Sequence, residues 1–352
     1  MHPYIKHINI QAFRTELVTW YQSVKRDLPW RKNLDPYAIL VSEIMLQQTQ
    51  VATVIPYFNS FMKKFPTAKD LADADADILL ESWAGLGYYS RARNLQESAK
   101  TIAELGAFPT VFSDILSLKG VGPYTAGAVA SIAFGMPVPA VDGNVFRVIS
   151  RISMIDLDIA KARTRKTFET VVSLLIDPQH AGDFNQGLME LGATICTPTS
   201  PKCGTCPLQN HCLAYRNGVD EQYPVKSKTV RQKTIKYIVA LVKNEHGQRL
   251  VTKREETGLL ANFYEFPQIP YEEGFPTDLL SDELARHNLD MKDIQKGADA
   301  KHVFTHLIWH MEAYDIKVCS KNTVLDEHHQ WVNDEALENL PLTVAHKKLL
   351  GK

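Results

Sequence analysis

Four of the five cysteines in the sequence lie close together, at Cys196, Cys203, Cys206 and Cys212. Their spacing, C-x6-C-x2-C-x5-C, allows four thiolates to surround one metal centre. Thiolates are soft ligands, which are typical of zinc sites and iron-sulfur clusters. The spacing leaves both open, but its first gap is longer than the gap of about two to four residues in zinc fingers, which favours a cluster. We expect the fifth cysteine, Cys319, to be a small buried apolar side chain.

A glycine-rich turn, Gly120-Val121-Gly122, precedes Pro123 and lies between two segments of helical pattern. Glycine lets the backbone approach a ligand closely, and proline is typical of the first position of a helix. The free N–H groups of that helix would favour an anion such as phosphate. The same pattern also fits a plain turn between two packed helices.

Asp142 stands directly before an amphipathic helical segment that begins with Val145 and Phe146. An aspartate in this position is most often a cap. The helix dipole and the N–H donors also favour its charged form. Asp142 is therefore a candidate for a carboxylate that stays negative.

The elements that must position these residues are helical from residue 10 to about 215, since the apolar side chains recur at helical spacing. Asp35 and Pro36 predict the capped start of one helix, which we expect to continue through about Gln50 and to carry Glu43 and Gln48.

The composition fits a globular protein of two domains, with 352 residues, 45% apolar and 22% charged. A polar linker, 216–232, follows the helical region 1–215. The remainder, 233–352, predicts an α+β domain with strands at 234–242, 249–253 and 302–318 and helices at 279–287 and 343–350. Residues 245–247 are expected to join the first two strands as a hairpin.

The net charge of −1 does not point to a polyanion partner, so any such contact must come from a local face. The sequence shows neither a signal peptide nor an apolar run long enough to span a bilayer. Cysteines clustered in this way fit a reducing compartment. We therefore expect a cytoplasmic protein, associated with the nucleoid if it is bacterial.

The helix-hairpin-helix, the following aspartate and the cysteine cluster occur in the order seen in the endonuclease III superfamily of DNA glycosylases, which this chain resembles. SEIMLQQTQV around Glu43, WAGLGYYSRARNL at 83–95 and VDGNVFRV around Asp142 resemble the branch that removes adenine mispaired with 8-oxoguanine. The resemblance implies base excision repair by a monomer with a [4Fe-4S] cluster, acting on double-stranded DNA with an adenine:8-oxoguanine or adenine:guanine mispair. It also implies a helix-hairpin-helix subdomain at 31–135 and an iron-sulfur subdomain from 1–30 and 136–215.

Within the superfamily, enzymes that also cut the DNA strand place a lysine in the second helix of the hairpin, where this chain has Tyr124. Tyrosine cannot form an imine with the sugar. The resemblance therefore implies a glycosylase that leaves the abasic site uncut.

Removing a purine requires a proton on the departing base and stabilisation of an oxocarbenium-like sugar. The resemblance implies Glu43 as the general acid and Asp142 as the charged partner that stabilises or attacks the sugar, oriented by Tyr124 and Asn144. For Glu43 to hold a proton near neutral pH, its pKa must rise from about 4.3, which requires apolar walls. Those expected are Trp30, Ile44 and Leu46.

The resemblance also implies contacts with extruded adenine and with the DNA around it. The adenine pocket would contain Arg26, Trp30, Arg31, Leu46 and Gln186. The groups that enter or approach the duplex would be Gln48, Thr49, Leu86, Tyr88, Gly120 and Gly122. The first gap of the cysteine motif has one basic residue, Lys202, so we expect fewer phosphate contacts there than in relatives.

Residues 233–352 resemble the Nudix-like domain with which such glycosylases recognise 8-oxoguanine. After GLLANFYEFPQIP the sequence lacks the Arg-Glu and Glu-Glu helix of an active Nudix hydrolase, which indicates a recognition domain. Phe304, Thr305 and His306 stand where the family has its Phe-Ser-His loop. The same residues could also belong to an ordinary exposed strand.

Two other functions fit parts of this pattern. One is an oxidised-pyrimidine or thymine-mismatch glycosylase on the same scaffold, which Tyr124 and the additional C-terminal domain argue against. The other is a non-catalytic, metal-dependent DNA-binding protein, for which replacing Glu43 or Asp142 would have no effect on activity.

Overall fold

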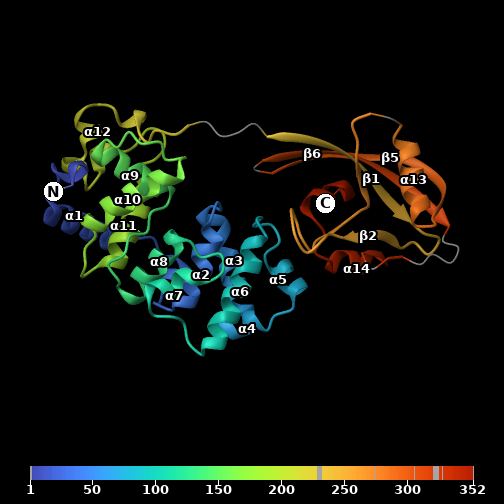
Figure 1. Ribbon diagram of the computed structural model, residues 1–352, viewed down its shortest axis with the longest axis horizontal. Helices are drawn as coiled ribbons and strands as arrows, with labels where there is room; N and C mark the ends of the chain where they lie inside the picture. Colours follow the sequence, from blue (N-terminus) through green and yellow to red (C-terminus); the bar gives the residue numbers. More distant parts are fainter. Residues whose placement is uncertain are drawn as a thin grey trace. The chain divides into compact units, whose positions relative to one another are not determined.

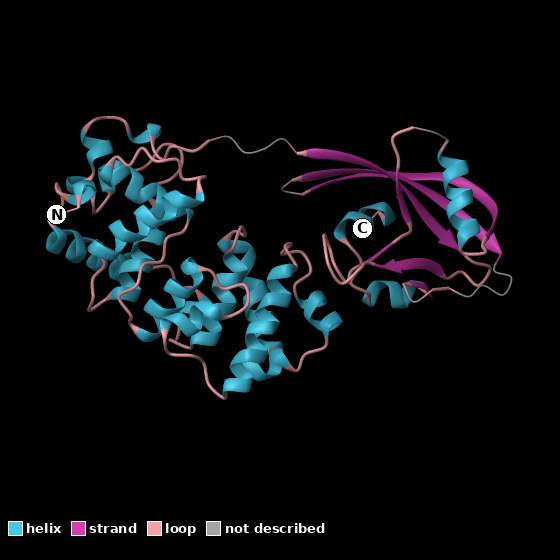
Figure 2. Cartoon of the chain, in the orientation of Figure 1, coloured by secondary structure: helices cyan, strands magenta, loops and turns pink. Residues whose placement is uncertain are grey.

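The computed structural model describes residues 2–227, 232–273, 275–304, 306–319, 325–326 and 328–351. The chain forms two compact units (Figure 1). The first consists of residues up to Asp75 and from Leu86 into the linker, and the second of the C-terminal region together with residues 76–85. Helices and loops make up the first unit, and a β-sheet with helices makes up the C-terminal region (Figure 2).

The region before the linker is helical, as the apolar spacing predicted. Caps and prolines define where key helices begin, since Asp35 accepts the N–H of Tyr37 at 3.0 Å and Pro36 and Pro123 occupy first helical positions. The helices are α1 (Ile10–Val24), α2 (Pro36–Leu46), α3 (Val51–Lys64), α4 (Ala68–Ala72), α5 (Ala76–Ser82), α6 (Ser90–Leu105), α7 (Phe112–Ser117), α8 (Pro123–Phe134), α9 (Gly143–Ser153), α10 (Arg165–Leu175), α11 (Ala181–Thr194) and α12 (Leu213–Arg216). None of the described helices is long and apolar enough to cross a membrane.

Helix α2 ends earlier than the sequence predicted. It stops at Leu46, and α3 begins at Val51. Between them Gln48 has a φ of 58°, in the left-handed region that interrupts a right-handed helix. Gln48 therefore lies in an exposed turn and not on a helix face.

One hydrophobic core draws on both ends of the helical region. Phe13 and Leu17 of α1 pack with Phe184 and Leu188 of α11, and α9 and α10 add further apolar side chains. The rings of Phe13 and Phe184 lie 6.1 Å apart. This core anchors α9, whose N-cap is Asp142, and α11, which leads into the cysteine loop.

The C-terminal region is built on one mixed sheet, in which seven strands occur among the described residues (Figure 2). Its main order is β3-β2-β1-β6-β5, with β4 paired to β1 and β7 paired to β2. The strands β1 and β6 run parallel, whereas β5 and β6 are antiparallel. The strands are β1 (Lys233–Lys243), β2 (Arg249–Lys253), β3 (Tyr264–Glu265), β4 (Gln268–Pro270), β5 (Asp290–Val303), β6 (Leu307–Cys319) and β7 (His329–Val332).

Helices cover both faces of this sheet. Ile238 and Val242 of β1 pack with Leu280 and Leu284 of α13 (Pro276–Arg286). Val239 belongs to the core on the other face of the sheet. That core also includes side chains of α14 (Asp334–Asn339), α15 (Val344–Lys347) and the turn after α15. Successive strand residues point to opposite faces, so β1, buried on both, carries an unbroken apolar run.

The helices near 279–287 and 343–350 and the hairpin at 245–247 agree with the sequence-based expectation. The expected strand 302–318 is wrong, because β5 ends at Val303 and β6 begins at Leu307, so that the range contains the end of one strand and most of another. The sequence did not reveal β5 because it is an edge strand whose side chains are mostly exposed and polar.

Candidate active site

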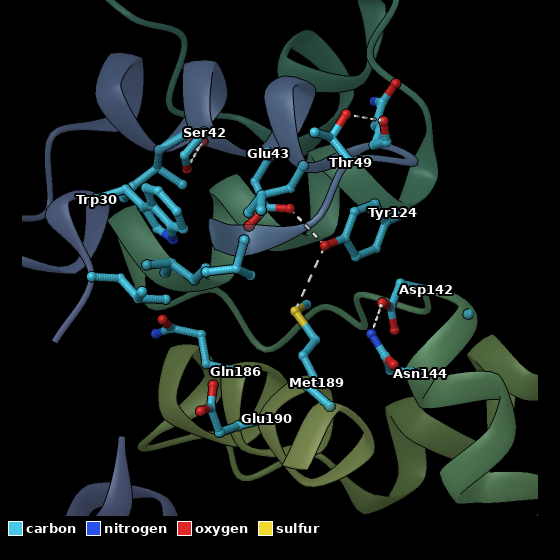
Figure 3. A pocket seen from close by; sticks show the side chains of 18 of the residues that line it. Trp30, Ser42, Glu43, Thr49, Tyr124, Asp142, Asn144, Gln186, Met189 and Glu190 are labelled. Carbon is cyan, nitrogen blue, oxygen red and sulfur yellow. Dashed lines mark hydrogen bonds between the residues drawn. The ribbon is translucent and has the colours of Figure 1, made fainter. Parts of the chain in front are cut away.

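A cavity of about 560 Å³ opens among η2 (Pro29–Arg31), α2, α8, α9 and α11 (Figure 3). Its size is that of a small-molecule pocket. Eleven of the residues singled out from the sequence line it, namely Arg26, Trp30, Arg31, Glu43, Leu46, Gln48, Thr49, Tyr124, Asp142, Asn144 and Gln186. One expected apolar wall, Ile44, is buried away from the cavity, and Ile39 lines it in its place.

Glu43 is a buried carboxyl group on α2, with 6% of the residue exposed. The hydroxyl of Tyr124 donates to Glu43 Oε2 at 2.6 Å, and it also lies 3.7 Å from the sulfur of Met189. Burial raises the pKa of Glu43 to about 7, aided by the charge of Asp142, while the Tyr124 hydrogen bond and Arg31 act in the opposite direction. At neutral pH Glu43 therefore has a substantial protonated fraction, as a general acid requires.

Asp142 caps helix α9, as the sequence predicted. Its Oδ1 accepts the N–H of Val145 at 2.8 Å, and its Oδ2 accepts the side-chain amide of Asn144 at 2.8 Å. Burial raises the pKa of Asp142, and these hydrogen bonds oppose the rise without cancelling it. The N–H donors at the helix start therefore favour the charged form, as expected, but burial outweighs them, since a buried negative charge is costly until a positive charge lies near it.

A line of hydrogen bonds connects Asp142 to the cysteine loop through Asn144 and Arg147. Arg147 Nη2 donates to Asn144 Oδ1 and to the carbonyl of Gly192, both at 2.8 Å, and its Nε donates to the carbonyl of Cys196 at 2.8 Å. The amide of Asn144 is thereby oriented with its nitrogen towards Asp142. Nothing in the sequence alone identified Arg147.

Close packing of α11 against Asn144 gives a prediction for Gly192→Ala. A Cβ at Gly192 would lie 2.6 Å from the Cβ of Asn144 and 3.1 Å from its Cα, so the start of α9 must shift. Because misplacing a reacting group by about 1 Å can reduce a rate about 100-fold, we expect a 10- to 100-fold lower single-turnover rate for the reaction in this pocket. Gly187→Ala on the same helix is the control, since the atoms nearest to its Cβ would be side-chain atoms of Leu17 and Tyr21. Equal rates for the two variants would contradict the prediction.

On the other side of the pocket, Glu190 of α11 holds two arginines. It is 2% exposed in its side chain and pairs with Arg26 and with Arg31, the latter at 2.9 Å. Burial acts to raise the pKa of Glu190, but hydrogen bonds and charge from Arg26 and Arg31 outweigh it and lower the pKa. Arg31 also donates to Gln186 at 3.1 Å. Sequence reasoning missed Glu190, although a charged residue four positions after Gln186 on an apolar helix was a usable signal.

The residues expected to enter the duplex lie in two turns outside the helices. Gln48 is exposed, and Tyr88 is 44% exposed with a φ of 48°. Leu86, expected beside them, is buried. Gly120 has a φ of 77° in the turn before α8, and Gly122 precedes its first residue, which leaves the N–H groups of this helix start available.

The four clustered cysteines line one small cavity next to α9. Arg151 of α9, which is 2% exposed, donates to the sulfur of Cys196 at 3.2 Å and to the carbonyls of Thr197 and Pro198. Burial raises the pKa of Cys206 to about 12 and of Cys212 to about 11, although backbone N–H groups point at both sulfurs. Thiolates in this setting require a metal centre to stabilise them, so the donor set fits an iron-sulfur cluster held by all four cysteines.

In the C-terminal region, Phe304 and His306 lie in the turn between β5 and β6, and Thr305 lies outside the described residues. The ring of Phe304 contacts Trp309 at 4.9 Å and His302 at 4.6 Å. His306 is exposed, and its carbonyl accepts the N–H of Lys233 at 3.1 Å. The turn thus offers one partly packed aromatic ring and one exposed imidazole.

Three family models match the chain. Residues 41–173 match the HhH-GPD superfamily of base excision DNA repair proteins, residues 196–212 the iron-sulfur binding domain of endonuclease III, and residues 238–352 the NUDIX domain. Together with the fold and the pocket, these matches define a helix-hairpin-helix DNA glycosylase of base excision repair with a [4Fe-4S] cluster and a C-terminal Nudix domain.

Curated relatives specify the family. Human adenine DNA glycosylase is 35% identical over 97% of this chain and 73% of its own length. Adenine DNA glycosylase of Buchnera aphidicola subsp. Schizaphis graminum (strain Sg) is also 35% identical, over 86% of this chain and 87% of its own. The chain belongs to the adenine DNA glycosylases, which are hydrolases acting on N-glycosyl bonds.

Two solved structures share the fold of the part of the chain that they cover. A thermostable thymine-DNA glycosylase is 30% identical with a TM-score of 0.53, covering 59% of this chain and 97% of that one. Endonuclease III in a non-covalent complex with DNA is 24% identical with a TM-score of 0.50, covering 60% and 98%, and shares the fold.

Proposed function

We propose that this protein acts as a monomer that removes adenine mispaired with 8-oxoguanine or guanine, and leaves the abasic site uncut. The observation that carries the proposal is the pairing of two carboxyl groups in one pocket. Glu43 has a pKa raised to about 7, and Asp142 is fixed at a helix N-terminus. Such a pair supplies an acid for the base and a negative charge for the sugar.

In the proposed mechanism, Glu43 donates its proton to the imidazole-ring nitrogen of adenine. The bond between the sugar and the base then breaks, with its electron pair leaving on the base. The hydroxyl of Tyr124, 2.6 Å from Glu43 Oε2, stabilises the carboxylate that remains. That carboxylate can accept a proton from the water that attacks the sugar, which restores the acid.

Asp142 is proposed to stabilise the positive sugar, or to attack it and form a transient covalent bond. Its buried charge is costly in the free protein, and a cationic sugar would relieve that cost. The interaction is therefore stronger in the transition state than in the ground state, as catalysis requires. Asn144, oriented by Arg147, holds the carboxylate in position.

Strand cleavage is not expected. A lyase needs an amine that forms an imine with the sugar, and no lysine is among the described residues that line the pocket. The cluster would supply coordination bonds that hold residues 196–212 as a rigid loop next to Arg147 and Arg151.

Adenine recognition is proposed to use the arginine side of the pocket. Glu190 fixes the guanidinium groups of Arg26 and Arg31, and Gln186 accepts from Arg31. Trp30 and Leu46 supply apolar surface for the base. Extrusion of the nucleotide would be supported by Gln48 and Tyr88, with Thr49, Gly120 and Gly122 near the backbone, while buried Leu86 is better suited to supporting Tyr88.

The base opposite adenine is proposed to be recognised by the C-terminal domain, through Phe304, Thr305 and His306. The exposed imidazole of His306 offers a hydrogen-bonding group. The sequence after β4 lacks the acidic helix of Nudix hydrolases, so this domain would act in recognition without hydrolysis.

The test is a set of duplexes that differ in one pair: adenine opposite 8-oxoguanine, guanine or thymine, and thymine opposite guanine. After incubation, alkali reveals abasic sites, and a parallel sample without alkali reveals any lyase activity. We expect cleavage at adenine, fastest opposite 8-oxoguanine, only after alkali. Cleavage at the mispaired thymine, or strand breaks without alkali, would refute the proposal.

The two carboxyl groups give a prediction for pH dependence. Because Glu43 acts protonated and its pKa is about 7, the single-turnover rate should fall about tenfold per pH unit above that value. Asp142 acts in its ionised form, and its pKa is raised. The rate should therefore also fall as the pH is lowered, and this fall should begin at a higher pH than for an ordinary aspartate. The measurement is the rate of base removal against pH with saturating enzyme. A rate that is constant from pH 6 to 9 would contradict the role of Glu43; this range brackets a pKa of about 7.

A further inference from the structure

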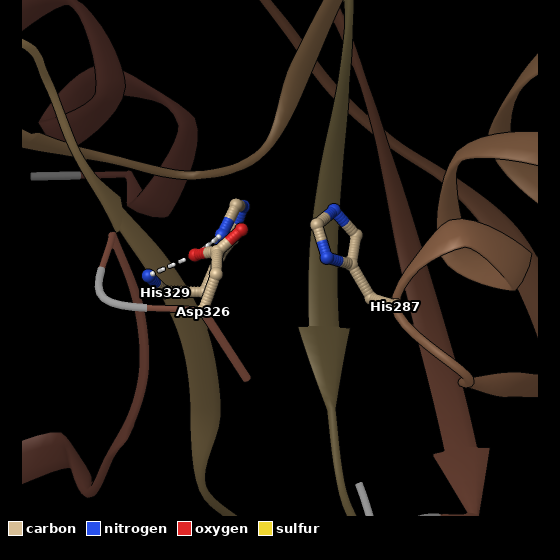
Figure 4. Close-up of side chains that lie close together, drawn as sticks. All are labelled: His287, Asp326 and His329. Atoms are coloured by element: carbon tan, nitrogen blue, oxygen red, sulfur yellow. Dashed lines mark hydrogen bonds and ion pairs between the residues drawn. The ribbon is translucent and has the colours of Figure 1, made fainter. Parts of the chain in front are cut away.

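Three side chains in the C-terminal region form a cluster that the glycosylase reaction does not use. His287 follows α13, Asp326 precedes β7 and His329 is its first residue (Figure 4). One ligand atom from each lies within 4.8 Å of the others. His329 Nδ1 is 2.6 Å from Asp326 Oδ1, and the two imidazole rings lie 4.2 Å apart.

The surroundings hold these groups in place. Asp326 Oδ1 also accepts the backbone N–H groups of His328 at 3.0 Å and His329 at 3.1 Å, which fixes the carboxylate. The side chains of His287 and His329 are only 15% and 12% exposed. Glu283, one turn before His287 on α13, brings its Oε1 to 3.8 Å from His287 Nε2. Second carboxylates and fixed ligands of this kind are typical around protein metal sites.

We propose that His287, Asp326 and His329 bind a divalent transition-metal ion of the zinc type, with the carboxylate of Glu283 beside His287. Two imidazoles and one carboxylate are ligands that zinc accepts, at about 2.0–2.2 Å each. Two imidazole rings this close would repel each other if both were protonated, whereas a cation between them uses their lone pairs. The ion would join the end of α13 to the start of β7, two segments far apart in the sequence.

The test uses the full-length, cluster-loaded protein, so that the cysteines are occupied, after removal of loosely bound metal with a chelator. Titration calorimetry with zinc should show one site per chain. Replacing a ligand should weaken binding at least tenfold, by analogy with the 10–100-fold loss of affinity typical when a supporting residue of a metal site is removed. The variants are His287→Gln, Asp326→Asn and His329→Gln. The control is His246→Gln, since His246 is exposed in the β1–β2 turn of the same domain.

Crystals of the wild-type protein soaked with zinc provide a readout that does not depend on variant folding. We expect an anomalous difference peak between the three side chains at the zinc absorption edge. The absence of a peak there would overturn the proposal. So would zinc binding that is unchanged when His287, Asp326 and His329 are all replaced in one variant.

A second, independent observation concerns Arg91 of α6, which is 8% exposed. Its Nη1 donates to the carbonyls of Ile44 at 2.9 Å and Met45 at 3.0 Å, and also to that of Gln47. Its Nη2 donates to the carbonyls of Leu86 at 3.0 Å and Gly87 at 3.1 Å, and to Thr49 Oγ1 at 3.3 Å. One guanidinium therefore connects two turns that are about forty residues apart in the sequence.

These two turns present Gln48 and Tyr88. Both residues have positive φ, 58° and 48°, a conformation that is unfavourable for residues other than glycine and must be held by surrounding contacts. Arg91 donates to the carbonyl of Gln47 and to the hydroxyl of Thr49, the residues on either side of Gln48, and its guanidinium lies 5.6 Å from the ring of Tyr88.

We infer that Arg91 is a positioning residue that holds both turns in the conformation in which they meet DNA; this inference rests on the proposed function. Arg91→Met would leave the carbonyls without their donor. We expect a 10- to 100-fold lower single-turnover rate, a smaller fluorescence change of 2-aminopurine placed at the target nucleotide, and an unchanged alkaline pH midpoint. Arg91→Lys, which keeps the charge but loses the forked donors, should recover only part of the rate.

Lys100→Met is the control, since Lys100 is exposed on the same helix. Thr49→Val removes one acceptor of the guanidinium and should lower the rate two- to fivefold even if Arg91→Met folds poorly. Faster hydrogen exchange at 47–50 and 86–89 in Arg91→Met is a second expected readout. If the Arg91 variants removed adenine at the wild-type rate and showed wild-type hydrogen exchange, this inference would be overturned, but the proposed removal of adenine would still stand. A wild-type protein that removes no adenine would instead refute the proposed function.

Discussion

Glu43→Gln is expected to reduce the single-turnover rate of adenine removal by about 10²–10⁴-fold, the usual contribution of a general acid. Glutamine has the same shape and can still accept the hydrogen bond from Tyr124, which lies 2.6 Å from Oε2. It has no proton to give to the departing base. We therefore expect normal binding of the mispaired duplex with nearly all turnover lost, and a remaining rate that no longer falls above pH 7, the pKa of Glu43 being about 7.

The matched control is Glu97→Gln, because Glu97 is an exposed glutamate that pairs with Lys100 on α6. Its rate should equal that of the wild type. Binding would be measured by fluorescence anisotropy on a duplex with a non-cleavable adenosine analogue. If Glu43→Gln kept the wild-type rate, the proton would come from another group, and the proposed mechanism would be wrong.

The sequence was sufficient to predict the residues that form local motifs. Asp142 directly precedes an amphipathic helical segment, and Cys196 to Cys212 are close in the chain, so their spacing limits their geometry. Glu43 was found through the resemblance, since a glutamate within a helix is otherwise most often exposed. The pocket brings Glu43 and Asp142 together with Tyr124 and Asn144.

The buried and half-buried charged residues were not predictable in the same way. Arg91, Arg147, Arg151 and Glu190 each bind groups from distant parts of the chain, and those partners become visible only in the folded protein. A charged residue on an amphipathic helix is usually on the solvated face. Whether such a residue is instead buried depends on which carbonyls or charged groups it meets in the fold. The periodicity of the sequence does not predict those partners.

The errors in secondary structure also have physical causes. Helix α2 was predicted to reach about Gln50 because no glycine or proline marks its end, yet the chain turns at Gln48 with a positive φ. Arg91 supplies the hydrogen bonds that compensate for this conformation. Strand β5 was missed since an edge strand needs few apolar residues, and its pairing with β6 provides the backbone hydrogen bonds.

Asp142→Asn is the second large prediction, with an expected loss of about 10³-fold in the rate of base removal, in the range observed when one electrostatic contact to a transition state is lost. Asparagine caps a helix as well as aspartate does, so α9 should keep its first turn and Val145 its hydrogen bond. The negative charge that faces the sugar disappears, together with the hydrogen bond from Asn144, because the new amide nitrogen cannot accept it. The acidic fall of the pH profile, which we assign to protonation of Asp142, should disappear with it.

Asp35→Asn is a close control, because Asp35 caps α2 in the same way, accepting the N–H of Tyr37 at 3.0 Å, and is not among the residues that line the pocket. The two variants make the same chemical change at the same type of helix position, so a difference in rate between them separates the effect in the pocket from any effect on the cap. If both variants slowed base removal equally, the effect would come from the helix starts, and Asp142 would be a structural cap without a role in stabilising the sugar.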